Sequence, residues 1–144
     1  MFLHIKDVLT PEEITFFRQA LGPQAPWIEG ARSAGGQAIH QKNNLQLAQG
    51  SELSAQLQTM VKAALHRNAL FFSAALPRRI YNPLFNNYGD GANFYGNHVD
   101  SAVMHSKADN CWVRSDLSCT VFLTPPEDYD GGELVITETL GEKR

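Results

Sequence analysis

The sequence predicts an α+β domain, with helices in the first half of the chain and antiparallel strands in the second. Two observations support this class. Helix-start signals and apolar residues at helical spacing occupy positions 10–65, whereas short strand-like runs separated by turn signals occupy positions 79–137. Short strands after a helical lead favour an antiparallel sandwich or a jelly roll. At 144 residues the chain is expected to form one domain spanning 1–144.

The first predicted helix begins at the motif Thr10-Pro11-Glu12-Glu13. Thr10 can cap the first turn, Pro11 suits the first helical position, and Glu13 can reach back to the cap. Gly22-Pro23 should stop the helix. Its apolar residues fit one amphipathic face that packs on the core: Ile14, Phe16, Phe17 and Leu21.

A second predicted helix begins after Ser51, where apolar residues recur at helical spacing. They are Leu53, Leu57, Met60, Val61, Ala64 and Leu65. We expect this stripe to pack against the core and to hold no ligand.

Residues 31–46, between the two helices, are rich in Ser, Gly, Gln and Asn, which indicates a loop or an irregular ribbon. Its run Gln41-Lys42-Asn43-Asn44 is polar enough to face solvent or a substrate. A solvated connection is the more common role of such a segment.

Strand character dominates the second half of the chain. We expect strands at 79–81, 84–88, 98–100, 115–124 and 133–137, with a polar loop at 106–110 and a strong turn signal at 125–132. In the fourth of these, side chains should alternate between two faces, Leu117, Cys119, Val121 and Leu123 on one and Ser118, Thr120 and Phe122 on the other.

Composition excludes several classes of function. A net charge of −3 and a pI near 5.9 give no basic footprint for nucleic acid or an anionic membrane. The N-terminus lacks the pattern of a signal peptide, and no apolar run approaches the length that a membrane helix needs. Cys111 and Cys119 lack metal or redox spacing and are expected to be reduced. These features predict a cytoplasmic protein.

His98-Val99-Asp100 is the most informative motif for function. Residues two apart on a β-strand project from the same face, so His98 and Asp100 can act together. They would be two of the three ligands in the 2-His-1-carboxylate triad of non-haem Fe(II) oxygenases. For the other histidines, His4, His40, His66 and His105, a surface or otherwise satisfied role is the more common one.

Several further motifs stand in order around this pair. They are Gln41-Lys42-Asn43-Asn44, Leu76-Pro77-Arg78-Arg79, Pro83-Leu84-Phe85-Asn86-Asn87-Tyr88, Tyr95-Gly96-Asn97-His98-Val99-Asp100, Arg114-Ser115-Asp116-Leu117-Ser118, Phe122-Leu123-Thr124 and Asp128-Tyr129-Asp130-Gly131-Gly132-Glu133-Leu134-Val135. In these motifs the chain resembles, over essentially its whole length, the PKHD-type hydroxylases, bacterial relatives of prolyl and lysyl hydroxylases.

The resemblance implies N-terminal helices packed on a double-stranded β-helix, or jelly roll. It also implies a hydroxylase that depends on Fe(II), 2-oxoglutarate and O₂, with ascorbate as a further cofactor, and a link to iron uptake. His98 and Asp100 would be the metal ligands. Tyr88 is expected to line the 2-oxoglutarate pocket through its hydroxyl, with Thr120 a weaker candidate; a packed aromatic is the alternative for Tyr88. The hydroxylated target stays open.

In that family the second histidine and the arginine that binds 2-oxoglutarate lie on late strands, which here would fall beyond Arg144. We therefore expect the barrel to be incomplete at its C-terminus and the 144-residue chain to have little or no activity. The alternative is a non-catalytic jelly-roll remnant or partner-binding module, whose exposed sheet edge would favour a homo-oligomer. Tyr95 should pack, and Arg114 should pair with Asp116 or Glu133 at the surface.

Overall fold

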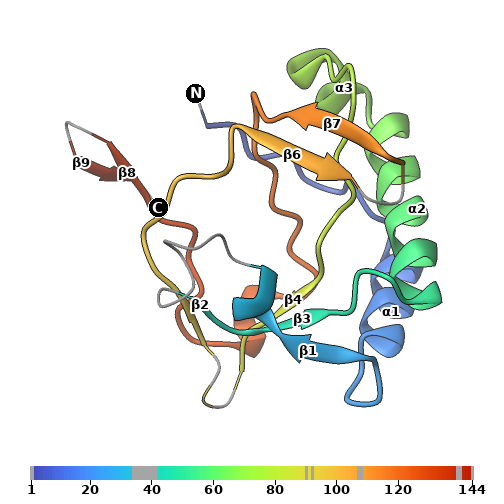
Figure 1. Ribbon diagram of the computed structural model, residues 1–144, viewed down its shortest axis with the longest axis vertical. Coiled ribbons are helices and arrows are strands. Elements are labelled where there is room, and N and C mark those ends of the chain that lie inside the picture. Colours follow the sequence, from blue (N-terminus) through green and yellow to red (C-terminus); the bar gives the residue numbers. More distant parts are fainter. Residues whose placement is uncertain are drawn as a thin grey trace.

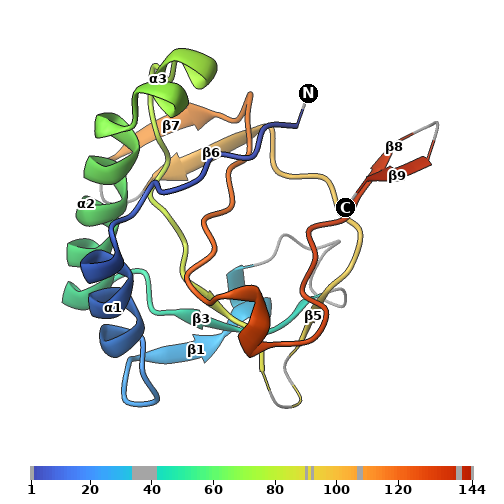
Figure 2. The same cartoon turned by 180° about the vertical axis from the view of Figure 1, so that it is seen from behind.

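The helices lie along one side of the molecule and the extended segments lie along the other (Figures 1 and 2). This arrangement is seen in a computed structural model, which describes residues 2–33, 42–89, 91, 93–106, 109–138 and 141–143. Three helices combine with short antiparallel strands, so the predicted α+β class is confirmed.

Both predicted helices are present. α1 spans Pro11–Ala20 and begins with the complete capping box, in which Thr10 Oγ1 accepts from the Glu13 amide and the Glu13 carboxylate accepts from the Thr10 amide. α2 spans Glu52–Arg67 and is capped by Ser51.

A third helix, α3 (Ala69–Ala75), was not predicted. It follows α2 after Asn68, whose side-chain oxygen accepts from the Phe71 amide at 2.8 Å. One asparagine thus ends one helix and caps the next, because its short side chain competes well for free amides at a helix start.

Nine short strands form four antiparallel sheets among the described residues. The three-stranded sheet joins β1 (Trp27–Glu29), β3 (Leu45–Leu47) and β4 (Asn86–Asn87). The three pairs are β2 (Lys42–Asn43) with β5 (Phe94–Tyr95), β6 (Val103–Ser106) with β7 (Cys111–Arg114), and β8 (Ile136–Glu138) with β9 (Gly141–Lys143). Two single-turn 3₁₀ helices occur at Gly30–Ser33 and Pro126–Asp128. The jelly roll stays a prediction, because these ladders alone do not establish it.

Several predicted strands were wrong in extent. Residues 79–81, 98–100 and 115–124 lie in no strand, and only the middle of 84–88 is in one. Alternation of apolar and polar residues reports an extended backbone, but a strand also needs a partner at hydrogen-bond distance, which the pattern does not reveal.

Strands also form where loops were predicted. β2 and β3 lie within residues 31–46, although residues 34–41 of that segment, His40 and Gln41 included, are outside the described part. β6 and β7 form a hairpin that flanks the expected polar loop at 106–110, with Asn110 in the left-handed region at φ 45°.

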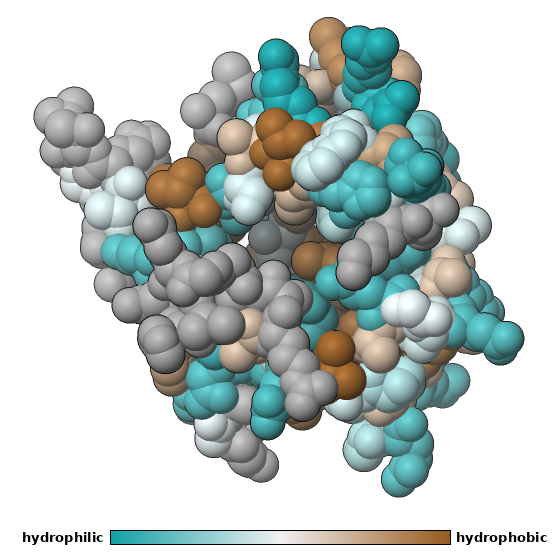
Figure 3. Space-filling model, viewed as in Figure 1, coloured by the Kyte–Doolittle hydropathy of each residue, from teal (hydrophilic) through white to brown (hydrophobic). Residues whose placement is uncertain are grey.

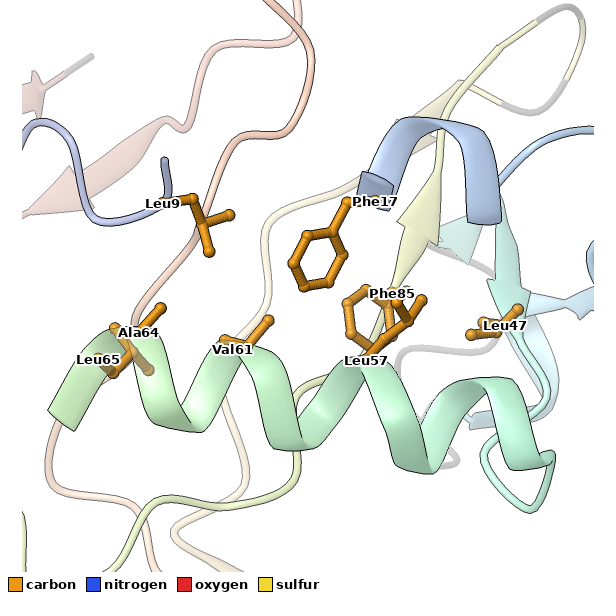
Figure 4. Packing of buried hydrophobic residues seen from close by; sticks show 8 residues of the cluster. All are labelled: Leu9, Phe17, Leu47, Leu57, Val61, Ala64, Leu65 and Phe85. Atoms are coloured by element: carbon orange, nitrogen blue, oxygen red, sulfur yellow. The ribbon is translucent and has the colours of Figure 1, made fainter. Parts of the chain in front are cut away.

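The main core lies between the helices and the three-stranded sheet. α2 directs one face toward Phe17 of α1 and Phe85 of the segment before β4 (Figure 4). Two residues of the predicted stripe, Leu57 and Ala64, are fully buried. The cluster consists of Leu9, Phe17, Leu47, Leu57, Val61, Ala64, Leu65 and Phe85.

Buried amides accompany this core where β3, the central strand of the sheet, pairs with β4. Asn44 and Gln46 are almost fully buried, and their Nδ2 and Nε2 atoms both donate to Asn86 Oδ1 at 3.1 Å. Across β3 and β4, Gln46 is also the register partner of Asn86. The side-chain contacts and the backbone ladder therefore specify the same alignment.

No helix in the described part of the chain is long and apolar enough to cross a membrane. On the face seen in Figure 3, apolar side chains occur singly or in small groups among hydrophilic ones. Several large apolar residues are nevertheless exposed, including Val99, Trp112 and Leu117.

Candidate functional site

His98 and Asp100 lie close together in an irregular segment that follows β5. Nε2 of His98 is 3.4 Å from Oδ1 of Asp100. The predicted strand at 98–100 is absent, yet the two side chains still face each other. At this distance the two atoms can form a weak ion pair when the histidine is protonated. Alternatively, both can offer a lone pair to one group that lies between them.

The other ring nitrogen of His98 is occupied locally. Nδ1 lies 2.7 Å from the carbonyl oxygen of Gly96. Because a carbonyl can only accept, Nδ1 carries the proton in this contact. In a neutral imidazole the lone pair is then on Nε2, the atom that faces Asp100.

Tyr95 stacks on the imidazole of His98. The ring centroids are 3.7 Å apart and the planes are inclined by 15°. The expectation that Tyr95 packs is confirmed, and its packing partner is the candidate ligand itself. Burial, and secondarily the negative charge of Asp100, raise the pKa of the Tyr95 hydroxyl.

The ladder between β2 and β5 anchors Tyr95. Lys42 is its register partner, and Lys42 Nζ lies 5.0 Å from the centroid of the Tyr95 ring, a cation–π contact. Lys42 is only 8% exposed, and this burial lowers the pKa of its ammonium group. Lys42 therefore places a buried cation beside Tyr95, the residue that stacks on His98. The buried state of Lys42 was not predicted from the sequence.

The turn before β5 is tied to the same strand. Gly91 has φ +78°, a conformation that glycine adopts without strain, and its carbonyl accepts from Asn43 Nδ2 at 2.8 Å. This bond joins the turn to β2 and helps to fix the start of the segment that carries His98.

Tyr88 lies just after β4, close enough to Tyr95 for their charges to interact. Burial raises the pKa of its hydroxyl, Tyr95 adds a smaller increase, and a hydrogen bond from the Asn44 side chain opposes both. The ring remains about half exposed. Its role toward 2-oxoglutarate stays a prediction.

Thr120, the weaker candidate, is exposed in the irregular segment after Asp116. Within the described residues it forms no hydrogen bond with His98, Asp100 or Tyr88. The neighbouring strand that should have presented it is absent, because residues 115–124 have no ladder partner in that part of the chain. Its role stays a prediction.

The other histidines that the structure describes do not join the pair. His4 lies in no strand. His66, on α2, has Nδ1 2.7 Å from the Lys62 carbonyl, and His105, on β6, packs against Trp112 with a centroid distance of 4.8 Å. No group of three or more His, Cys, Asp or Glu side chains in the described ranges is arranged to hold a metal ion.

The predicted surface ion pair of Arg114 is present. Arg114 pairs with Asp116, with Nη2 2.9 Å from Oδ1. Cys111 and Cys119 are free thiols, and burial raises the pKa of the Cys119 thiol.

Comparison with known proteins gives a consistent result. No family model matches the chain. The sequence is 51% identical to a PKHD-type hydroxylase of Variovorax paradoxus (strain S110), 49% identical to one of Polaromonas sp. (strain JS666 / ATCC BAA-500), and 48% identical to the PKHD-type hydroxylase YbiX of Escherichia coli (strain 55989 / EAEC). Each match covers 100% of this chain and 63% of the relative, so the chain spans less than two thirds of these relatives' length. The resemblance that the motifs indicated is thereby confirmed: over its whole length, this chain is similar to PKHD-type hydroxylases.

Proposed function

We propose that this chain contributes His98 and Asp100 as two of the three protein ligands of an Fe(II) site in a 2-oxoglutarate-dependent hydroxylase. The observation that carries the proposal is the 3.4 Å approach of His98 Nε2 to Asp100 Oδ1. The names of the relatives support a hydroxylase.

The donor set fits a ferrous ion. A neutral imidazole and a carboxylate are the ligand types of the facial triad. Metal-binding histidines usually donate their second ring N–H to a carbonyl or carboxylate, as His98 Nδ1 does to Gly96. That bond holds Nε2 free for a metal.

When bound, Fe(II) with 2-oxoglutarate and O₂ supplies the oxidising power for hydroxylation. The chain's own residues would hold the metal ion and orient 2-oxoglutarate. His98 and Asp100 supply donor atoms, and Tyr88 presents its hydroxyl to 2-oxoglutarate, with Thr120 a further candidate contact. The third ligand and the arginine for the keto acid would lie outside the described residues, on a jelly roll formed together with them. Ascorbate would serve as a reductant.

Metal binding tests this function directly. We expect anaerobic titration with Fe²⁺ to show binding that falls at least tenfold in His98→Ala and in Asp100→Ala. His66→Ala is the matched control, since His66 lies on α2 and engages only a backbone carbonyl. Unchanged affinity in both site variants would refute the proposal.

Turnover is a separate matter. We expect the 144-residue chain to form little or no succinate from 2-oxoglutarate, since the proposal gives it two of the three protein ligands of the triad. Succinate formation that depends on His98 would overturn this expectation and leave the metal site standing.

A second candidate is a partner-binding module, favoured by exposed apolar side chains. Val99 is 95% exposed, and Trp112 and Leu117 are each about two thirds exposed. Large apolar residues exposed in this way often mark a contact surface. A chain that sediments as a monomer at micromolar concentration and captures no second copy would argue against self-association.

A further inference from the structure

We propose that Tyr95 is a positioning residue for His98: its ring fixes the plane of the imidazole so that Nε2 faces Asp100. This inference rests on the proposed metal site and assigns to Tyr95 a task that neither ligand performs for itself. It follows from three contacts that run in series from β2 to the ligand pair.

The first step concerns the freedom of the His98 ring. The χ2 torsion of histidine is broad, so the ring needs outside constraints to hold one plane. The contact from Nδ1 to the Gly96 carbonyl restrains the ring at one edge, but a single hydrogen bond tolerates small concerted changes in χ1 and χ2 that swing Nε2. Tyr95, at 3.7 Å between centroids and 15° between planes, restricts that swing by covering one face of the ring.

The second step concerns how Tyr95 is itself held. His98 lies outside every strand of the described chain, whereas Tyr95 belongs to β5 and pairs with Lys42 of β2. The Lys42 ammonium lies 5.0 Å from the centroid of the tyrosine ring, and Lys42 is buried. The stack therefore transmits the rigidity of a backbone ladder to a residue that has no ladder of its own.

The third step separates positioning from ordinary packing. Phe94 precedes Tyr95 on the same strand and is about half exposed. Since strand side chains alternate, Phe94 points away from the face that Tyr95 occupies. Phe94→Leu therefore changes an aromatic residue on β5 without touching the stack, and it is the matched control.

The first experiment needs no metal. Nuclear magnetic resonance of the His98 ring protons should show a ring-current shift in the wild-type chain, in Tyr95→Phe and in Phe94→Leu. The shift should be lost in Tyr95→Leu, which keeps an apolar side chain but has no ring. Retention of the wild-type His98 signals in Tyr95→Leu would overturn the proposal.

The second experiment uses Co²⁺ as a redox-stable probe, with binding followed on the same signals. Offset aromatic contacts of this kind contribute enough to predict that Tyr95→Leu weakens Co²⁺ binding roughly 2- to 10-fold. Tyr95→Phe and Phe94→Leu should bind as the wild type does. Circular dichroism should show that all the variants are folded.

The two proposals fail in different ways. If the wild-type chain binds no Co²⁺ at His98, the proposed function fails, while the ring-current result still decides whether Tyr95 stacks on the imidazole, which the positioning role requires. If the wild type binds and Tyr95→Leu binds equally well, the positioning role is wrong and the metal site stands.

Discussion

The helical layer and the segment around His98 are organised by opposite means. Phe17, Leu57 and Ala64 are fully buried in one continuous core, whereas Val99 is 95% exposed between the two proposed ligands. Around the site, order comes from local contacts: one carbonyl, one stacked ring and a ladder of two residue pairs. The difference teaches that folding and ligand geometry depend on separate sets of residues, so each can be disrupted alone.

The largest effect should come from the core. Phe17→Ala removes a fully buried ring whose centroid lies 6.1 Å from that of Phe85. The free energy of unfolding should fall by about 3–5 kcal/mol. Urea denaturation measures this loss. Phe16→Ala, at the adjacent and 38% exposed position, should cost less than ~1.5 kcal/mol. Equal losses would show that α1 does not bury one preferred face.

A smaller loss should follow from crowding the junction between the two regions. A Cβ at Gly30 would lie 1.8 Å from Asn44 Oδ1, so Gly30→Ala should destabilise the fold by about 1–3 kcal/mol and disturb Asn44, whose side chain donates to Asn86. At Gly50 a Cβ would meet nothing within 4 Å, and Gly50→Ala should change stability by less than about 1 kcal/mol. Thermal unfolding compares the two, and similar melting temperatures would contradict the crowding.

Changes to the ligands themselves should barely affect stability. Asp100→Asn removes a carboxylate that is largely exposed, so the free energy of unfolding should stay within ~0.5 kcal/mol of the wild type while Fe²⁺ binding is lost. Cooperative unfolding measured beside metal titration checks both. A large drop in stability would show that the fold and the proposed site do not depend on separate sets of residues.

The smallest effect concerns pH and is confined to the helical layer. A hydrogen bond from Arg67 is the main cause that lowers the pKa of Glu13, followed by the Thr10 amide. A carboxylate with a lowered pKa in the folded state adds stability above its unfolded pKa, and this is lost as pH falls through the folded value. At neutral pH the wild type should be more stable than Glu13→Gln. This difference in the free energy of unfolding should disappear as the pH falls below 4.5, the ordinary pKa of a glutamate.

Denaturation curves at several acidic pH values measure this advantage. In Arg67→Met the free energy of unfolding should depend as weakly on acidic pH as in Glu13→Gln, since this variant removes the main cause of the lowered Glu13 pKa. Fe²⁺ binding by His98 and Asp100 should be the same in Glu13→Gln as in the wild type at neutral pH.

Sequence reasoning predicted the helical layer closely because its signals are local. The capping box at Thr10, the cap at Ser51 and the apolar stripe of α2 each act within a few residues. Strand boundaries depend on partners far along the chain. Lys42 pairs with Tyr95, and Leu45 pairs with Asn87. The residues around Lys42 and Leu45 carry no pattern that predicts these distant partners.

The site was predicted in part for the same reason. His98 and Asp100 are neighbours in sequence, so their proximity survives the absence of the predicted strand. The stacking of Tyr95 on His98 was missed, because a packing residue three positions away looks like any core aromatic. The burial of Lys42 was missed as well, since a lysine in a polar run is usually exposed to solvent.

The amide oxygen of Asn86 has a consequence for how the chain selects its native pairing. It accepts from both Asn44 and Gln46, which are almost fully buried. If β4 slipped by one residue against β3, Asn86 would turn to the opposite face, and two buried amides would lose their acceptor at a cost of about 1–3 kcal/mol each. Tyr88, two residues further on, would turn away with it. The shared oxygen thus discriminates against misaligned pairings of β3 with β4, two strands that lie far apart in the sequence.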